Sequence, residues 1–267
     1  MHPYGNPARP ARPLIWIGAA LILLLLLRSA AGYLIEYLWW REMNQVRTWI
    51  SMLTFSVLPG VAGFLISYAV LWVAHARGMK SAGAALRHHP RYAWISSAAL
   101  ILPSLFATLP VWSDRWTLLR YLGGAGMAGS SWRDPVFQLP LNFYFFDLPA
   151  FRMLISFLLG LIVLQAIVYF LANRGWTLAR RGAAWSPDGG VAVDFEDLRL
   201  GDLKESFWLR TSAAAAFLLL AASFWLDRYD LLFEEHGSLV GIDWTAEHFV
   251  IPLLLGKIAA SILAAAG

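Results

Sequence analysis

Residues 49–74, WISMLTFSVLPGVAGFLISYAVLWVA, contain no charged side chain. A helix that crosses a bilayer needs about 20 mostly apolar residues, and this segment exceeds that length. The segment is continuously apolar and does not alternate, which excludes the tilted strands of about 10 residues that build membrane β-barrels. Pro59 lies inside it, and neighbouring helices in a bilayer can satisfy the carbonyl group that a proline leaves unpaired. We therefore expect a kinked transmembrane helix here.

The composition of the whole chain agrees with a membrane protein. Of its 267 residues, 59% are hydrophobic and only 14% are charged, and the mean hydropathy is +0.57. Soluble domains carry about 25% charged residues and disordered chains are poor in apolar ones, so both classes are excluded. The chain has no cysteine, which excludes disulfides, cysteine zinc sites and thiol chemistry.

Six apolar segments predict an all-α membrane protein, a polytopic helical bundle of about six transmembrane helices. The expected spans are residues 14–34, 49–74, 92–112, 148–172, 207–226 and 249–266. Residues 1–13 are the expected cytoplasmic N-terminal tail, and residues 14–267 the transmembrane domain. Pro103 predicts a second kink, in the third span. Arg28 lies directly beside the one small-residue cleavage site and disfavours cleavage there, so we expect an uncleaved signal anchor.

The distribution of basic residues orients the chain. With the N-terminus in the cytoplasm, the inner segments hold 11 Lys and Arg residues and the outer segments hold 7. The contrast is sharpest between residues 75–91, with four bases and no acid, and residues 227–248, with six acids and one Arg. The positive-inside rule therefore predicts a multi-pass cell-membrane protein with a cytoplasmic N-terminus. The net charge of +4 follows from these loops, so we expect no nucleic-acid partner.

The segment between the third and fourth expected spans is dense in aromatic residues and prolines. Residues 132–149 read WRDPVFQLPLNFYFFDLP. Prolines restrict a chain to extended or turn conformations, and the aromatic rings supply apolar area without a helix. We expect an outer loop, re-entrant or interfacial, that packs on the bundle. Upstream, residues 115–122 predict a short interfacial helix. Gly124, Gly126 and Gly129 fit G-x-G-x-x-G literally, but they lack the strand and helix that nucleotide binding requires.

Several motifs, in this order, resemble those of a known family. The pattern D-P-x-F…F-Y-x-F-x-L-P comprises Asp134, Pro135, Phe137, Phe143, Tyr144, Phe146, Leu148 and Pro149. The other motifs are Tyr37 to Glu42, Trp225 to Phe233, Gly241, Trp244, Thr245, His248, Ile251 and Pro252. Together they are similar to an uncharacterised family of large bacterial integral membrane proteins, over about residues 34–257.

The resemblance implies a seven-helix membrane region followed by a large extracytoplasmic domain, and no established activity. This sequence departs from the family pattern at Pro140, where members usually have an acidic residue; this weakens any metal or acid–base role for the loop. The chain ends at Gly267, before a seventh helix. We therefore expect an N-terminal fragment of a larger protein.

Three groups of polar residues are candidate sites, each with a simpler structural interpretation. Lys257 falls near the middle of the sixth span, where an ammonium group costs at least ~2.5 kcal/mol. It belongs to an ion or proton pathway, or it is paired or reaches the interface. Asp243, Glu247 and His248 form a hard-cation or zinc-like site, or they cap and solvate the last helix. Residues 227–230, DRYD, form an ion-pair cluster that fixes helix depth, or an anchor for an extracytoplasmic domain.

No Ser-His-Asp, H-E-x-x-H or P-loop pattern is present, so the sequence favours a non-enzymatic protein without cofactor, catalytic or metal-binding residues. We expect a membrane anchor or scaffold for an envelope-facing domain or partner. The alternative is a transporter or channel-like subunit, and the third is a membrane-embedded enzyme acting on lipid. The expected partners are the lipid bilayer and a C-terminal extracytoplasmic domain or other envelope proteins. The candidate functional residues are Asp134, Pro135, Phe137, Phe143, Tyr144, Leu148, Pro149, Trp225, Asp227, Arg228, Tyr229, Asp243, Trp244, His248 and Lys257.

Overall fold

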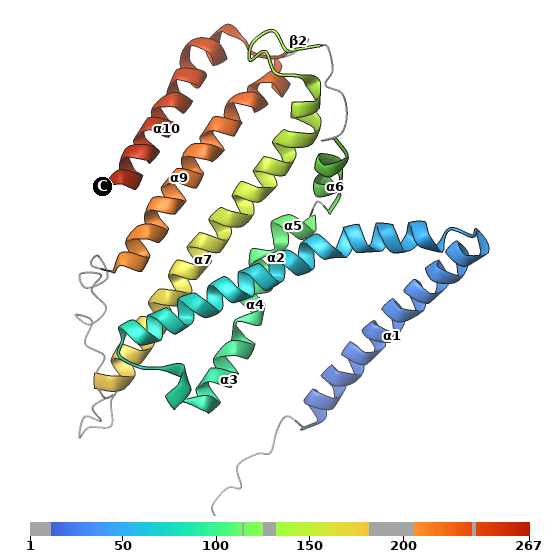
Figure 1. Cartoon of the computed structure of the whole chain (residues 1–267), viewed down its shortest axis with the longest axis vertical. Helices are drawn as coiled ribbons and strands as arrows, with labels where there is room; N and C mark the ends of the chain where they lie inside the picture. Colours follow the sequence, from blue (N-terminus) through green and yellow to red (C-terminus); the bar gives the residue numbers. More distant parts are fainter. Residues whose placement is uncertain (1–11, 114, 125–131, 182–205, 237–238) are drawn as a thin grey trace, which may run out of the picture. The chain divides into compact units, whose positions relative to one another are not determined.

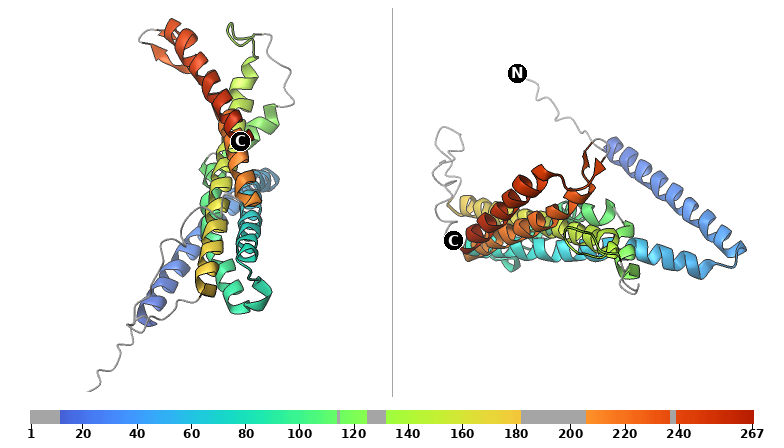
Figure 2. Two further views of the ribbon diagram at one scale, coloured as in Figure 1. Left: turned by 90° about the vertical axis from the view of Figure 1, so that its left-hand side faces the viewer. Right: turned by 90° about the horizontal axis from the view of Figure 1, so that it is seen from above.

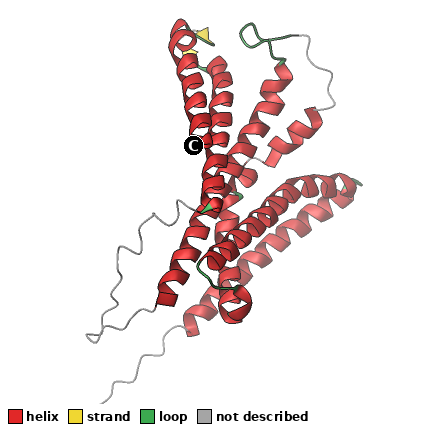
Figure 3. Ribbon diagram, turned by 60° about the vertical axis from the view of Figure 1, so that its left-hand side comes forward, coloured by secondary structure: helices red, strands yellow, loops and turns green. Residues whose placement is uncertain are grey.

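The computed structural model describes residues 12–113, 115–124, 132–181, 206–236 and 239–267. Helices make up nearly all of the regular structure in these ranges, which confirms the predicted all-α class (Figure 3). The strands described there are two of two residues each, which pair antiparallel: β1 (Glu235–His236) and β2 (Leu239–Val240). The expected cytoplasmic tail lies outside the described residues except for its last two. Residues 125–131, which include most of the G-x-G-x-x-G match, and residues 182–205, between the fourth and fifth expected spans, also lie outside them.

Five helical segments in the described ranges are long and apolar enough to cross a membrane. Their helices are α1 (Arg12–Glu42), α2 (Val46–Ser81), α7 (Leu148–Arg181), α9 (Phe207–Asp230) and α10 (Ile251–Ala266). These helices coincide with five of the six predicted spans and extend several of them by a turn or more. The chain therefore carries the helices of a multi-pass membrane protein.

The chain forms two compact units, residues 1–55 and 56–267, and α2 begins in the first and ends in the second. In the first unit, a tight turn follows α1 at Asn44, whose φ of 55° lies in the left-handed region that Asn tolerates. The rings of Tyr37 and Trp49 then meet at 5.8 Å between centroids. This contact fixes the start of α2 beside the end of α1.

In the second unit, α7, α9 and α10 lie side by side in that order (Figures 1 and 2). A buried polar contact joins the first two helices, because Gln165 Nε2 donates to Ser212 Oγ at 2.6 Å. Interhelical hydrogen bonds of this kind add to packing where lipid, and not water, surrounds the helices. An apolar cluster of Leu231, Ala246 and Leu254, with Phe224 packed against it, joins the segment that follows α9 to the start of α10.

The second half of α2 packs on α7 through small residues. A Cβ atom placed on Gly78 would lie 2.5 Å from the backbone oxygen of Tyr169, so only glycine permits this approach. Further along the same pair of helices, Leu71, Phe157 and Leu161 form an apolar cluster with neighbouring residues. The helix α2 continues through Pro59 as one element, as expected in a membrane environment.

The third predicted span, residues 92–112, is not one long helix. It consists of three consecutive helices, α3 (Pro90–Ala99), α4 (Ile101–Ala107) and α5 (Leu109–Ser113). Pro103 and Pro110 each lack the N–H group that would continue the hydrogen-bond ladder. Between them, Thr108 N–H donates to the carbonyl oxygen of Leu105, three residues earlier, at 3.2 Å. This is the spacing of a 3₁₀ turn, whereas an α-helix bonds residues four apart. The crossing of a membrane by this segment stays a prediction.

Short elements connect these helices. They are the 3₁₀-helix η1 (Leu86–His88), the helix α6 (Arg115–Gly124), the π-helical turn η2 (Phe143–Asp147), the 3₁₀-helix η4 (Leu231–Phe233) and the π-helical turn η5 (Ala246–Val250). The helix α6 covers the short helix predicted at residues 115–122. The turn η2 leads directly into α7, and η5 leads directly into α10, so both long helices begin with a wider first turn.

Candidate functional site

A buried carboxylate organises residues 133–140, which we call the Asp134 turn. The side chain of Asp134 is 2% exposed, and both of its oxygens accept hydrogen bonds. Oδ1 accepts from the backbone N–H groups of Val136 at 2.9 Å and Phe137 at 2.6 Å. Oδ2 accepts from the N–H of Leu139 at 2.8 Å and from the hydroxyl of Tyr144 at 2.7 Å. One side chain thus satisfies three backbone donors and one phenol.

The local sequence explains this geometry. Pro135 follows Asp134 and supplies the fixed φ that favours a turn, and an Asp at the first position of a turn accepts from the backbone that follows. The backbone of Asp134 also closes the turn, because its N–H donates to Leu139 O at 3.0 Å and its carbonyl accepts from Gln138 N–H at 3.1 Å. Arg133 Nη1 donates to Gln138 O at 2.9 Å. Gln138 has a φ of 59°, which this set of bonds imposes.

Two opposing effects set the pKa of Asp134. Burial raises the pKa, because it disfavours the charged form. The hydrogen bonds from Phe137, Tyr144, Leu139 and Val136 lower it, and together they prevail, so the pKa of Asp134 lies below its ordinary value. The carboxylate is therefore ionised at neutral pH and acts as the acceptor of the turn.

An aromatic cluster attaches the Asp134 turn to the helices. It consists of Phe137, Phe143, Tyr144, Tyr229 and Phe233. Phe137 and Phe143 contact the ring of Tyr229 edge to face, at centroid distances of 5.0 and 5.1 Å. Tyr144 contacts Phe233 at 5.9 Å. Tyr144 and Tyr229 are 6% and 8% exposed, so this end of α9 and the loop before α7 share one buried core.

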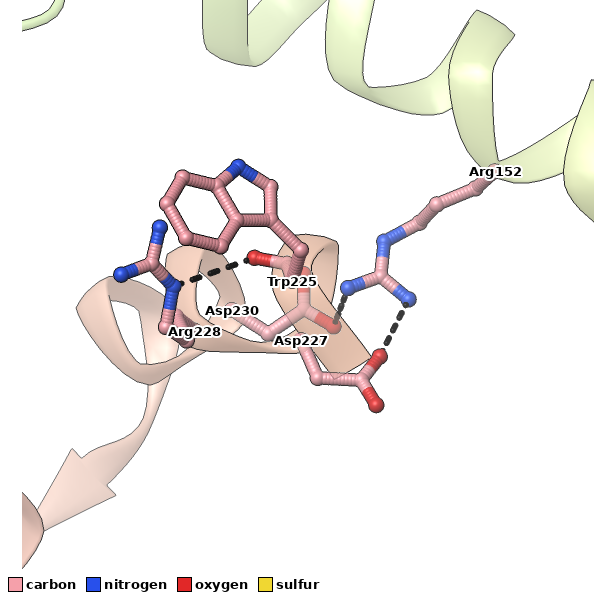
Figure 4. A network of polar contacts seen from close by, with 5 residues as sticks. All are labelled: Arg152, Trp225, Asp227, Arg228 and Asp230. Atoms are coloured by element: carbon pink, nitrogen blue, oxygen red, sulfur yellow. Dashed lines mark hydrogen bonds and ion pairs between the residues drawn. The ribbon is translucent and has the colours of Figure 1, made fainter. Parts of the chain in front are cut away.

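A group of ion pairs joins Arg152, one turn after the start of α7, to the end of α9. Arg152 Nη1 is 3.2 Å from Asp227 Oδ1, and its Nη2 pairs with Asp230 Oδ2 (Figure 4). The three side chains are about a third to a half exposed. In water such pairs contribute up to about 1 kcal/mol, and the attraction is stronger at the lower dielectric of a membrane interface. The predicted cluster at residues 227–230 therefore takes its cation from another helix.

Arg228, the basic residue inside that cluster, lies against aromatic rings instead. Its guanidinium carbon is 3.5 Å from the ring centroid of Trp225, and 5.8 Å from that of Phe137. Its Nε donates to the carbonyl oxygen of Trp225 at 3.3 Å (Figure 4). Cation–π contacts of this kind are attractive by about 0.5–2 kcal/mol. Arg228 thus covers the aromatic cluster.

The candidates before α10 form a separate group. Asp243 Oδ1 accepts the backbone N–H of Ala246 at 2.6 Å, which is the contact expected of a helix cap. The imidazole of His248 stacks on Trp244, with centroids 4.6 Å apart. In the described part of the chain no three His, Asp or Glu residues gather as a metal site would need, so His248 and Glu247 do not join Asp243 as ligands.

Lys257 lies on an exposed face of α10. Its Nζ is 5.5 Å from the ring centroid of Phe224, and it forms no ion pair with any residue in the described ranges. The structure therefore divides the candidates into three places: the Asp134 turn with the end of α9, the turn before α10, and Lys257.

Leu148 and Pro149 belong to the first of these places. Leu148 is buried beside Tyr229 in the shared core, and Pro149 stands in the first turn of α7, directly after the π-helical turn η2. Sequence reasoning missed Arg152 as the partner of Asp227. The sequence did contain a signal for this pair. Arg152 lies in the first turns of the fourth expected span, at the same membrane depth as the acids at the end of the fifth.

Comparisons with known proteins show the family of the chain. The model of the family described as "Uncharacterised protein family (UPF0182)" matches residues 13–267. A UPF0182 protein of Solibacter usitatus is 38% identical over 260 residues, which cover 96% of this chain and 28% of that protein. A UPF0182 protein of Cupriavidus necator is 28% identical, covering 98% of this chain and 29% of that protein. No solved structure matches the chain.

The chain thus spans under a third of the length of the curated relatives it matches. Its family model covers nearly the whole sequence, and its similarity to the Solibacter protein extends over nearly the same range. The motifs that carry the resemblance, from Tyr37 to Pro252, lie inside the matched range. The chain belongs to the uncharacterised protein family UPF0182.

Proposed function

We propose that this chain is a multi-pass membrane anchor that serves as a scaffold for an envelope-facing domain or partner. The observation that carries the proposal is the Asp134 turn, a rigid loop outside the five apolar spans. Its carboxylate is fully engaged, while Val136 and Trp132 beside it are 48% and 52% exposed. A surface that is already ordered loses little conformational entropy when a partner binds. Such a loop is suited to holding another folded part at a fixed position.

The charges at the two ends of the second unit support the orientation that this role requires. The end with the Asp134 turn carries Asp227, Asp230, Glu234 and Glu235. The opposite end, where α2 finishes and α3 begins, carries four bases in residues 75–91. Under the positive-inside rule the basic end faces the cytoplasm, so the N-terminus is cytoplasmic and the Asp134 turn faces the envelope.

The absence of cysteine in the sequence makes this orientation directly testable. Two single-cysteine variants, Val136→Cys and Lys80→Cys, place one thiol on an exposed residue at each end of the second unit. A membrane-impermeant maleimide added to intact spheroplasts should label Val136→Cys, and should label Lys80→Cys only after the membrane is permeabilised. The reverse pattern would overturn the proposed role, because the ordered loop would then face the cytoplasm.

A transport assay separates the anchor from the alternative of a transporter or channel-like subunit. The purified chain is reconstituted in liposomes, and fluxes of protons and monovalent ions are measured for the wild type and for Lys257→Met. We expect the same background flux for both proteins, since Lys257 has no acidic partner in the described ranges. A flux that Lys257→Met abolishes would favour transport over anchoring.

A further inference from the structure

A hollow of about 470 Å³ opens on the surface between α2, η1 and α3. We call it the Arg87 hollow. Trp72 of α2 lines one side, Arg87 of η1 lies at one end, and α3 contributes Ala93, Trp94 and Ser97. The spacing of these α3 residues places them on one face of the helix, where the small Ala93 and Ser97 leave room. The volume falls within the range of about 300–1,000 Å³ that is typical of small-molecule sites.

The walls of the hollow are held in place by contacts outside it. Tyr68 donates from its hydroxyl to the carbonyl oxygen of Ser97 at 3.2 Å, which fixes α3 against α2. At the end of α2, Gly83 has a φ of 76°, and the N–H of Ala84 donates to Met79 O at 2.9 Å. This is the left-handed glycine turn that commonly ends a helix, and it directs the chain into η1. The hollow is therefore preformed.

The lining combines one cation with two exposed indoles. Arg87 Nε donates to His88 Nε2 at 3.2 Å, and the two Nη groups make no hydrogen bond to any residue in the described ranges. Trp72 and Trp94 are 42% and 76% exposed, and their ring N–H groups are likewise unpaired among the described residues. A free guanidinium matches a phosphate in geometry and charge, and indoles favour the level of the lipid headgroups.

The surroundings carry the same charge as Arg87. Residues 75–91 hold Arg77, Lys80, Arg87 and Arg91 and no acid, and none of the four forms an ion pair within the described ranges. These are the first charges after the uncharged run of α2, so they lie where a transmembrane helix meets the headgroups. On the other side, exposed apolar residues such as Ile95 and Leu102 continue along α3 and α4.

We propose that the Arg87 hollow binds one anionic phospholipid. The lipid phosphate pairs with the free Nη groups of Arg87, and the glycerol and upper acyl chains lie over Ala93 and Ser97, between Trp72 and Trp94. The basic segment around the hollow favours a headgroup with net negative charge over a zwitterionic one. The hollow and the Asp134 turn lie at opposite ends of the second unit. Lipid binding at the hollow therefore does not depend on the proposed role as an anchor.

The test uses the full 267-residue chain, purified in detergent and stripped of lipid. It is mixed with equal amounts of phosphatidylglycerol and phosphatidylcholine of the same acyl chains, and retained lipids are counted by native mass spectrometry. We expect one retained phosphatidylglycerol in preference to phosphatidylcholine. Arg87→Gln should weaken its retention about fivefold, the factor expected for one Arg at an anionic membrane surface. Equal retention of the two lipids by the wild type would overturn the proposal.

Matched variants separate a site from general attraction to a basic surface. Arg91→Gln removes the same charge four residues along the chain, outside the lining of the hollow, and should reduce the retention of phosphatidylglycerol less than Arg87→Gln does. Ala93→Leu fills the hollow without changing any charge and should reduce retention; it also carries the test if Arg87→Gln does not fold. Equal losses in Arg87→Gln and Arg91→Gln would contradict a defined site.

A final arm distinguishes a lipid from free phosphate. Millimolar inorganic phosphate is added to the wild type before and after loading with phosphatidylglycerol. The proposal requires that phosphate does not displace the lipid, since the acyl chains contribute apolar contacts with Trp72 and Trp94. Displacement by inorganic phosphate alone would show that the hollow is an anion site and would overturn the lipid assignment.

Discussion

Replacing Asp134 with Asn tests whether one carboxylate holds the outer loop together. Asn keeps the shape of Asp but exchanges one accepting oxygen for an NH₂ group that donates. The less costly orientation turns this group toward Tyr144, whose hydroxyl can rotate and accept, and leaves the N–H of Leu139 unpaired. One buried unpaired donor costs about 1–3 kcal/mol, and weaker bonds to an uncharged acceptor add roughly 1 kcal/mol. We expect the turn to lose about 2–4 kcal/mol of local stability.

Hydrogen–deuterium exchange measures this loss where it occurs. Since each 1.4 kcal/mol is a factor of ten, amide exchange in the peptide 132–145 should accelerate roughly 30- to 700-fold in Asp134→Asn. Tyr144→Phe removes only one of the four bonds to the carboxylate and keeps the ring in the aromatic cluster, so its effect should be smaller. Comparing the two variants shows how much of the stability of the turn comes from the Tyr144 hydroxyl and how much from the backbone donors.

The matched control is Glu235→Gln, which neutralises an exposed acid near the same end of α9. It should leave exchange in the peptide 132–145 at the wild-type rate. Unchanged exchange in Asp134→Asn would refute the reasoning, because the turn would then be held by its prolines and aromatic rings alone. A uniform acceleration across all helices would also contradict it, since the expected effect is local.

Three further predictions concern pH, the ion pairs and helix packing. The pKa of Asp134 is lowered in the folded chain, so the ionised carboxylate stabilises the turn fully at pH values above its ordinary pKa of about 4. This stabilisation is lost as the pH falls through the lowered pKa of the folded chain. Below that pH, the amide exchange rates of the wild type and Asp134→Asn should become equal. A double-mutant cycle of Arg152→Gln and Asp227→Asn should give a coupling of about 0.5–1 kcal/mol in thermal unfolding, reduced by salt. Gly78→Val should lower the unfolding temperature in detergent by a destabilisation of about 1–3 kcal/mol, because its Cβ would overlap α7, whereas Gly175→Ala, with open space around it, should not.

The long helices could be predicted from sequence because their signal is local. Continuous apolar runs marked α1, α2, α7, α9 and α10, and in a bilayer any such run must form a helix to satisfy its own backbone. The helix ends were harder to place. The helix α2 extends beyond the uncharged run, which stops at Ala74, to Ser81, and the glycine turn at Gly83 follows.

The segment at residues 92–112 shows where local reasoning was insufficient. One proline was expected to kink a helix, and Pro59 in α2 leaves that helix continuous. Pro103 and Pro110 are seven residues apart, and each removes one ladder bond, so the segment divides into three pieces. One break, at Leu100, lies three residues before Pro103, and the other, at Thr108, lies two residues before Pro110.

The residues of the candidate site could be predicted from the sequence, but the contacts between them could not. Asp134, Tyr144 and Tyr229 were all identified from the motifs, yet the motifs do not indicate that a carboxylate satisfies the loop backbone. The pairing of Arg152 with Asp227 joins residues 75 positions apart. Contacts at such separations follow from how α7 and α9 pack, and this packing is not encoded in any one segment.

The attachment of the Asp134 turn to Tyr229 has a consequence for biosynthesis. The turn leaves the ribosome before α7 and α9, but the aromatic surface that receives Phe137 and Phe143 exists only once α9 stands beside α7. Chains fold from the N-terminus during synthesis, and a long loop closes only after its far end is available. The packing of Phe137 and Phe143 on Tyr229 therefore forms only after both helices have been inserted and paired, whereas the bonds of Asp134 within the turn do not depend on α9.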